Sequence, residues 1–360
     1  MKFTVIGSGA IGGLAGAYMT EAGHDVTMVD RWTEHVDAMK KNGLRIDGVR
    51  GDKYVAVTAA LPSELTGDLG VVLIATKSQH AVAATQEIAH LLTPDSCVIS
   101  FQNGFNEPDM VAALNDAGLP GEKIIMGSIP NYGGALVDPG YIEYVHEGPI
   151  QLGEMDGTMS DRLRDIADAL SALTEVQVSD RIWGQIWAKE VYASQVVFSA
   201  LVDAPIRESL GNERYARISG AVVKEALEIA DAKGIDVQPF DFFDPANYRV
   251  KTAEDTRKLL DNVNHAIWLL KKDQDTKPTH QFKKRGSGIW WDIVYRNRPS
   301  ETRSSSGKLI AYGEAVGADT RLNAKLFNMI YEIEDGKREL GFHNFDELEA
   351  YVADCGKTLP

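Results

Sequence analysis

One lysine of this sequence stands in a setting that suits proton transfer. Lys189 lies in the run IWAKEV, among the apolar residues Ile186, Trp187 and Val191. If this run is helical, the ammonium group lies near an apolar surface, and partial desolvation would lower its pKa toward working pH. Such a lysine can donate a proton to an oxygen that gains negative charge. The alternative is a surface lysine whose methylenes cover apolar residues while its ammonium group stays in water.

A glycine-rich turn near the start of the sequence indicates a dinucleotide site. The stretch IGSGAIGGLAG, residues 6–16, follows the apolar run KFTVI and precedes a run with helical spacing. Glycine permits positive φ and close backbone approach, and a helix that begins at such a turn directs its free amides at a pyrophosphate. A tight turn without a ligand is the alternative. The predicted cofactor-binding residues of the turn are Gly7, Ser8, Gly9, Ala10, Ile11 and Gly12.

An acidic residue follows the turn at the distance expected for ribose recognition. Asp30 ends the run DVTMVD, roughly 20 residues after the glycines, as in dinucleotide-binding βαβ units. Its carboxylate can accept both hydroxyls of the adenosine ribose and would repel a 2′-phosphate. We therefore predict NAD as the preferred cofactor. Arg31 follows directly and can pair with a 2′-phosphate, so NADP remains an alternative cofactor.

Three further polar positions could contact a bound cofactor or its substrate. Lys77 ends the strand-like run VVLIATK, and Asn103 with Gly104 follows the next such run, CVISFQNG. Parallel sheets present ligand-binding loops at these strand ends. Glu301 begins a polar segment ahead of a predicted helix. The alternatives are a solvated lysine, a common Asn-Gly turn and a favourable charge near a helix start.

The elements that would position these residues fall into two predicted domains. Short β-branched runs alternate with helical stretches in residues 1–180, which is typical of an α/β domain with a Rossmann-like, doubly wound parallel sheet. The later runs KIIMG, YIEYV, IQLG and EVQVS are predicted to extend or cap that sheet. Long amphipathic stretches in residues 181–360 predict an all-helical domain. Within it, residues of about 237–286 depart from this pattern and are interpreted as an insertion.

Composition narrows the class of partner. The 360 residues include 37 basic and 52 acidic side chains, a formal net charge of −15, which argues against a general binder of nucleic acids or anionic membranes. Cys97 and Cys355 are too few for a disulfide framework or a thiolate metal site. With no leader and no apolar run of about 20 residues, a cytoplasmic protein is expected. The expected partners are a small-molecule substrate and a second copy of the chain in a homodimer, with no metal.

Taken in order, these motifs resemble those of the ketopantoate reductases, or 2-dehydropantoate 2-reductases. The matching positions are Gly7, Gly9, Gly12, Lys77, Asn103, Gly104, Trp187, Lys189, Glu301 and Gly307. They span nearly the whole sequence outside residues 237–286. The resemblance implies that Lys189 is the proton donor, that Asn103 and Lys77 contact cofactor and substrate, and that Glu301 binds near the nicotinamide ribose. Ser287 matches a serine that the family carries before its glutamate, which implies a substrate-binding role.

Two positions depart from the family pattern. One and two turns after Lys189, the family carries asparagines that contact its substrate, whereas this sequence has Ala193 and Val197. Ser194 or Gln195 could take their place only in a shifted register. Because substrate hydroxyls would lack partners there, we predict poor turnover of ketopantoate relative to some other carbonyl compound.

Three functions are consistent with these features. The leading one is an oxidoreductase that transfers hydride between a nicotinamide cofactor and a small 2-oxo acid, or a related carbonyl compound, with Lys189 as general acid or base. An opine-type or polyol-phosphate dehydrogenase also has a glycine turn followed by a helical domain, but it explains Trp187, Lys189 and Glu301 less well. A non-catalytic dinucleotide sensor has no need of a proton donor.

Overall fold

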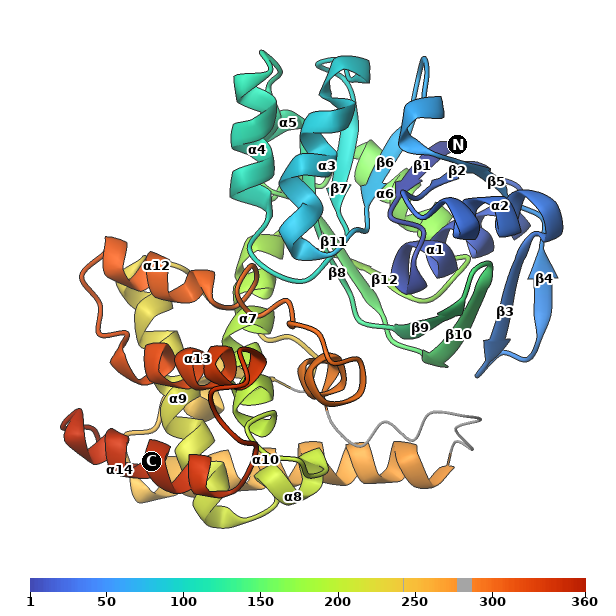
Figure 1. Cartoon of the computed structure of the whole chain (residues 1–360). Helices are drawn as coiled ribbons and strands as arrows, with labels where there is room; N and C mark the ends of the chain where they lie inside the picture. The colour runs from blue at the N-terminus through green and yellow to red at the C-terminus, as the bar shows by residue number, and fades with distance from the viewer. Residues whose placement is uncertain (242, 277–286) are drawn as a thin grey trace. The chain divides into compact units, whose positions relative to one another are not determined.

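The chain divides into two structural units. A computed structural model describes residues 1–241, 243–276 and 287–360 (Figure 1). The units are Met1–Ile186 and Trp187–Pro360. The predicted domain boundary, between residues 180 and 181, lies just before helix α7 (Ile182–Ser199), and the division between the units lies within that helix. Of the predicted insertion, residues 242 and 277–286 lie outside the described residues.

An eight-stranded sheet forms the centre of the first unit. In spatial order its strands are β12 (Val176–Val178), β11 (Ile150–Glu154), β8 (Ile125–Pro130), β7 (Cys97–Ser100), β6 (Val71–Ile74), β1 (Lys2–Ile6), β2 (Asp25–Val29) and β5 (Thr58–Ala60). Neighbouring strands are parallel except β8 with β11. The central strands β6 and β7 are almost wholly buried, which explains their continuous apolar runs. The predicted Rossmann-like sheet is confirmed.

Helices cover both faces of this sheet, as in a doubly wound fold. They are α1 (Ala10–Glu21), α2 (Thr33–Asn42), α3 (Ala81–Ile88), α4 (Glu107–Asp116), α5 (Gly121–Ile124) and α6 (Asp161–Leu170). Successive strand residues point to opposite faces. Leu73 packs in the hydrophobic cluster that includes Leu14 of α1, whereas Val72 packs in the cluster that includes Met110 of α4. Each face of the sheet therefore has its own core.

The carboxyl ends of four neighbouring strands are level with one another. Ile6 pairs with Val29 and with Ile74, and Ile74 pairs with Ser100, at the last residues of β1, β2, β6 and β7. The segments that follow these residues leave the sheet at one edge, where open parallel sheets bind their ligands. All the predicted site residues of the first unit lie on these segments.

A second, smaller sheet packs against α1. Its strands, in spatial order, are β4 (Lys53–Val55), β3 (Leu44–Gly48), β10 (Tyr141–His146) and β9 (Gly133–Asp138). The run YIEYV forms β10 of this sheet, whereas KIIMG, IQLG and EVQVS extend the main sheet as β8, β11 and β12. A side chain at Gly13 of α1 would lie 2.4 Å from Ile142 Cδ1. The glycine therefore lets β10 approach the helix closely.

Every named element in the described part of the second unit is helical. After α7 these are α8 (Ile206–Leu210), α9 (Glu213–Ala232), the 3₁₀ turn η4 (Pro245–Tyr248), α10 (Ala253–Thr276), α11 (Gly288–Trp290), the π-helical turn η5 (Trp291–Tyr295), α12 (Lys308–Ala315), α13 (Arg321–Glu334) and α14 (His343–Asp354). Aromatic stacking contributes to the core, where the ring centroids of Phe198 and Phe345 lie 4.1 Å apart. The predicted all-helical domain is confirmed. None of the helices described has the length and apolar composition that a bilayer span requires.

Candidate active site

The three glycines of the first turn have different structural roles. Gly7 has φ +93°, and a side chain there would lie 2.7 Å from the backbone nitrogen of Thr76. A side chain on Gly12 would lie 2.2 Å from the carbonyl oxygen of Gly7, so glycine is needed for α1 to pack on the sheet. A Cβ at Gly9 would meet nothing beyond its chain neighbours within 4 Å, and α1 begins there without a side-chain cap. An anion can therefore approach the first amides of the helix.

Two buried side chains hold this turn in place. His35 of α2 is fully buried, its Nε2 lies 2.9 Å from the carbonyl oxygen of Ser8, and its Nδ1 accepts from the amide of Gly140 at 2.9 Å. This pairing selects the neutral ring with its proton on Nε2. The hydroxyl of Tyr132 donates to the carbonyl oxygen of Ile11 at 2.7 Å, and burial raises the pKa of Tyr132, which keeps it a donor. Neither residue carries a sequence signal that predicts this role.

Asp30 directly follows β2 at the same edge of the sheet. It is half-buried, and its Oδ1 accepts from the amide of Trp32 at 3.0 Å. The side chain of Arg31 is 70% exposed, and its Nη2 lies 2.9 Å from Oε2 of Glu87. In this arrangement the guanidinium of Arg31 is engaged by a carboxylate of α3, while Asp30 remains beside the glycine turn.

A buried asparagine brings the segments of Lys77 and Asn103 together. Lys77 and Asn103 are exposed, and they follow the neighbouring strands β6 and β7. Asn106 is 1% exposed; its Oδ1 accepts from Ser78 Oγ at 2.8 Å, and its Nδ2 donates to the carbonyl oxygen of Asn103 at 2.7 Å. Gly104 supplies the left-handed turn between them, with φ +104°. The two predicted segments thus form one polar edge with the glycine turn.

Lys189 lies on a partly exposed stripe of α7. It is half-buried, whereas its chain neighbours Trp187, Ala188, Glu190 and Val191 are all buried. A helix places residues three or four apart on one face, and the residues at those distances include several that are also half-buried. Lys189 therefore lies half-buried next to buried residues of α7, and its catalytic role stays a prediction.

The two positions that depart from the family pattern have different surroundings. Ala193, one turn after Lys189, is half-buried and shares its stripe of α7. Val197, one turn further, is fully buried. Of these two positions, only Ala193 therefore lies on the partly exposed stripe of Lys189, and Val197 belongs to the core of the second unit.

Neither of the neighbouring polar residues replaces the missing asparagines. Gln195 is 3% exposed, and its Nε2 donates to Ser219 Oγ at 3.1 Å while its Oε1 accepts from the hydroxyl of Tyr248 at 3.2 Å. Its amide is thus used within the second unit. Ser194 is fully buried. On α7, which is a continuous helix, Ser194 and Gln195 are not three or four residues from Lys189 and so do not share its stripe.

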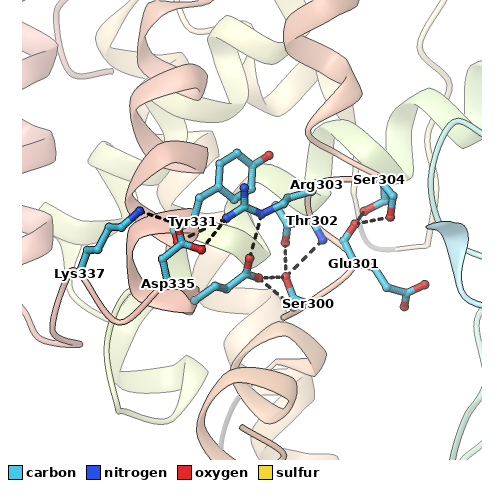
Figure 2. A network of polar contacts seen from close by, with 10 residues as sticks. Ser300, Glu301, Thr302, Arg303, Ser304, Tyr331, Asp335 and Lys337 are labelled. Atoms are coloured by element: carbon cyan, nitrogen blue, oxygen red, sulfur yellow. Dashed lines mark hydrogen bonds and ion pairs between the residues drawn. The ribbon is translucent and has the colours of Figure 1, made fainter. Parts of the chain in front are cut away.

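A buried hydrogen bond joins the segment of Glu301 to the helix of Lys189. Ser306 Oγ donates to Glu190 Oε2 at 2.8 Å, and both residues are buried. Glu190 follows Lys189 on α7, and Ser306 lies on the same turn as Glu301, ahead of α12. Figure 2 shows the carboxylate of Glu301 directed away from the neighbouring contacts of Arg303.

Ser287 begins the short helix α11 and caps it. Its Oγ accepts from the amide of Trp290 at 3.2 Å, and the residue is 5% exposed. It directly follows residues 277–286, which lie outside the described chain. Its contact with substrate stays a prediction. Across the described residues, no three His, Cys, Asp or Glu side chains are grouped so as to hold a metal ion.

Comparisons with known proteins point to one family. The model of the family described as "Ketopantoate reductase PanE/ApbA" matches residues 3–157, and that of its C-terminal domain matches residues 181–334. A 2-dehydropantoate 2-reductase of Pyrococcus abyssi is 28% identical over 346 residues, covering 94% of this chain and 100% of that protein. One from Archaeoglobus fulgidus is 25% identical over 337 residues, covering 93% and 98%.

Solved structures share the fold at lower identity. A ternary structure of D-mandelate dehydrogenase with NADH and anilino(oxo)acetate aligns with a TM-score of 0.76 at 20% identity, covering 94% of this chain and 99% of that one. A PanE/ApbA family ketopantoate reductase from Ralstonia eutropha aligns with a TM-score of 0.72 at 23% identity, covering 94% and 100%.

Proposed function

Because the chain belongs to the ketopantoate reductase family, we propose that it reduces the carbonyl group of a small 2-oxo acid, or of a related carbonyl compound, with a nicotinamide nucleotide. It is an oxidoreductase that acts on a CH–OH group and uses a pyridine nucleotide. The observation that carries the proposal is the level edge of the main sheet. There an open helix N-terminus lies beside an acidic residue and two exposed polar residues.

The residues of this edge fit a dinucleotide. The open position at Gly9 admits a pyrophosphate to the first amides of α1, and Asp30 can accept hydroxyls of the adenosine ribose. Lys77 and Asn103 are proposed to contact the cofactor from the next two strands, with Asn103 toward the nicotinamide. When bound there, a nicotinamide nucleotide would supply hydride to the carbonyl carbon, or accept it in the reverse direction. We propose NAD as the preferred cofactor.

We expect Gly9→Ala to fold normally and to lose cofactor affinity. A methyl group at Gly9 would have none of the described residues within 4 Å apart from its neighbours along the chain, but it would fill the space through which a pyrophosphate would reach the helix. The expected loss is about tenfold or more, which corresponds to about 1.4 kcal/mol of binding free energy. Thermal unfolding and titration with NADH measure the two properties separately.

Gly12→Ala is the matched control in the same turn. Its methyl group would lie 2.2 Å from the carbonyl oxygen of Gly7 and 2.8 Å from Ala75 Cβ. This overpacking should lower Tm, whereas Gly9→Ala should not. A folded Gly9→Ala protein with wild-type affinity for NADH would remove the turn from the cofactor site.

The proton transfer is assigned to Lys189. As hydride adds to the carbonyl carbon, the π electrons of the C=O bond move to oxygen, and the ammonium group of Lys189 donates its proton there. The products are a hydroxyl group and a neutral lysine, which regains its proton from solvent. Glu301 is proposed to bind the nicotinamide ribose, and Ser287 is proposed to bind the substrate.

We expect ketopantoate to be reduced at least about tenfold less efficiently than the best 2-oxo acid with an apolar side group. The methyl group of Ala193 offers no partner to a substrate hydroxyl, and a buried unpaired hydroxyl costs roughly 1–3 kcal/mol. The test is kcat/KM across a panel that contains ketopantoate, phenylglyoxylate and aliphatic 2-oxo acids. Phenylglyoxylate is included because it is the 2-oxo acid that corresponds to mandelate, and D-mandelate dehydrogenase shares the fold of this chain.

Ala193→Asn is the complementary variant for substrate choice. Its amide would supply a hydrogen-bonding partner on the stripe of Lys189, so efficiency with ketopantoate should rise relative to phenylglyoxylate. If ketopantoate is the best substrate of the unaltered protein, the interpretation of this stripe is wrong.

A two-way screen tests the proposed function as a whole. It pairs 2-oxo acids with both reduced nicotinamide cofactors, and 2-hydroxy acids with both oxidised ones, and follows the absorbance of reduced nicotinamide. Amino acids together with 2-oxo acids, and polyol phosphates, extend the panel to the opine-type and polyol-phosphate alternatives. A dinucleotide sensor would bind cofactor with no absorbance change in any mixture. The predicted homodimer is tested by light scattering on the same preparation.

A further inference from the structure

The turn that carries Glu301 is held at both ends by buried carboxylates. The Glu301 segment is residues 300–306, ahead of α12. Glu334 of α13 binds its first residue, and Glu190 of α7 binds its last. We propose that Glu190 and Glu334 are positioning residues that hold Glu301 at the nicotinamide ribose. The inference rests on the proposed function, because Glu301 has this role only where a nicotinamide nucleotide binds.

Glu334 anchors the start of the Glu301 segment. Its side chain is 1% exposed, and its Oε1 accepts from the amide of Ser300 at 2.8 Å and from the hydroxyl of Ser300 at 2.6 Å. Nε of Arg303 lies 3.4 Å from its other oxygen. As the last residue of α13, Glu334 places a negative charge where the helix dipole disfavours one, and burial adds a desolvation cost. The donors of the Glu301 segment offset both costs.

Bonds within the segment fix the backbone of Glu301. Ser300 Oγ lies 2.8 Å from Thr302 Oγ1 and accepts from the amide of Thr302 at 3.2 Å (Figure 2). The amides of Ser304 and Ser305 both donate to the carbonyl oxygen of Glu301 at 3.0 Å. The bonds from Ser304 and Ser305 use the carbonyl group of Glu301, and Figure 2 shows its carboxylate directed away from the contacts of the segment. The segment therefore orients Glu301 through its main chain.

Glu190 joins the other end of the segment to the helix of Lys189. Glu190 is 2% exposed and Ser306 is 3% exposed, and the hydroxyl of Ser306 donates to Glu190 Oε2 at 2.8 Å. Because Glu190 follows Lys189 on a continuous helix, this bond links the residue proposed for the nicotinamide ribose with the one proposed for the substrate oxygen. A shift of Glu301 relative to Lys189 would leave a buried carboxylate without this partner, which is costly.

A positioning role and a purely structural role of Glu190 and Glu334 predict different effects of their replacement on stability and on ligand binding. If the carboxylates only stabilise the second unit, their removal lowers stability and acts independently of Glu301. If they position Glu301, their removal weakens binding of a ligand that reaches Glu301, and that effect disappears once Glu301 itself is replaced. Such non-additivity is the expected behaviour of residues that act through one another.

The test uses the paired replacement Glu190→Met with Ser306→Ala. It removes both partners of the hydrogen bond and leaves no buried carboxylate behind. The probes are NADH and ADP, because ADP lacks the nicotinamide ribose. We expect about tenfold weaker binding of NADH, unchanged binding of ADP, and no further loss when Glu301→Gln is added. Ser306→Thr, made with Glu190 in place, keeps the hydroxyl that donates to Glu190 and should keep most of the affinity for NADH.

Two further variants test the contact of Ser300 with Glu334 and provide a control at the surface. Ser300→Ala should show the same non-additivity with Glu301→Gln, which keeps the proposal testable if the paired replacement does not fold. Lys337→Ala is the matched control, because Lys337 pairs with exposed Asp335 of the same network at 3.0 Å and should leave NADH binding unchanged.

Additive losses with Glu301→Gln, or equal losses of NADH and ADP affinity, would overturn the positioning role. An unchanged NADH affinity in Glu301→Gln would overturn it as well. Failure of the proposed function has a different signature, in which the unaltered protein reduces no compound of the carbonyl panel. The binding cycle can succeed in that case, because it measures cofactor binding without turnover.

Discussion

Replacement of Lys189 by alanine is expected to lower kcat by roughly 10²-fold or more while the affinity for NADH stays near wild type. This is the usual scale for loss of a general acid. Reduction of a ketone leaves negative charge on oxygen, and the ammonium group of Lys189, a half-buried residue, can both stabilise that charge and deliver the proton. The effect should fall on kcat, because the cofactor residues proposed for the first unit are untouched. Steady-state kinetics with the best substrate and NADH titration measure it.

Two further variants separate this role from that of an ordinary helix lysine. Lys189→Arg should not restore turnover, since a guanidinium stays protonated and has a different shape. Lys224→Ala is the matched control: Lys224 of α9 is also half-buried, between the buried residues Val223 and Glu225, and its loss should leave kcat unchanged. Near-normal turnover in a folded Lys189→Ala protein would place Lys189 among surface lysines and remove it from the mechanism.

With NAD as cofactor, kcat/KM is expected to exceed that with NADP by about 10²-fold. Two unit charges 4 Å apart repel by about 4 kcal/mol at an effective dielectric constant of 20, and about 2.7 kcal/mol is enough for that ratio. Asp30 supplies the carboxylate at the end of β2. Arg31, the residue that could favour a 2′-phosphate, is paired with Glu87 at 2.9 Å.

Asp30→Ala should gain efficiency with NADP and lose it with NAD. The variant removes the repulsion and the acceptor for the ribose hydroxyls, and it leaves Arg31 in place. Asp25→Ala, at the exposed opposite end of the same strand, is the matched control and should leave the ratio unchanged. Equal efficiencies with both cofactors in the unaltered protein, or better use of NADP, would contradict the proposed role of Asp30.

The main sheet was predictable because its central strands are buried on both faces. Strands such as β6 and β7 must then be mostly apolar on both faces. Their sequences, VVLI and CVIS, have this character. The separate small sheet was not predictable in the same way. Its strand β10 has the same apolar character as a main-sheet strand, and its place depends on the contact of Ile142 with Gly13, a long-range packing relation. The glycine-rich strand β9 carries little strand signal of its own.

The site residues also fall into two groups, those predictable from local sequence and those that depend on distant partners. Spacing alone pointed to the glycine turn, because Gly7, Gly9 and Gly12 stand close together between the end of β1 and the first turn of α1. The polar residues that support the site were missed, namely His35, Tyr132, Asn106, Glu190 and Glu334. Each is buried and hydrogen-bonded to a distant segment, such as Glu190 to Ser306, 116 residues away. Burial of a polar side chain is explained only by its partner, and the partner is known only when the fold is known.

The most direct measurement is to follow the transferred hydride itself. The protein is incubated with NADH that carries deuterium at C4 of the nicotinamide, on each face in turn, and with the best 2-oxo acid of the panel, and the product is analysed by NMR and mass spectrometry. We expect deuterium from one face to appear on the carbon that bears the new hydroxyl group, at a rate that Lys189→Ala lowers by roughly 10²-fold. The proposed function would be contradicted if the protein bound the labelled cofactor but no product contained deuterium. This outcome would have to hold for every compound of the panel and for labelled NADPH as well.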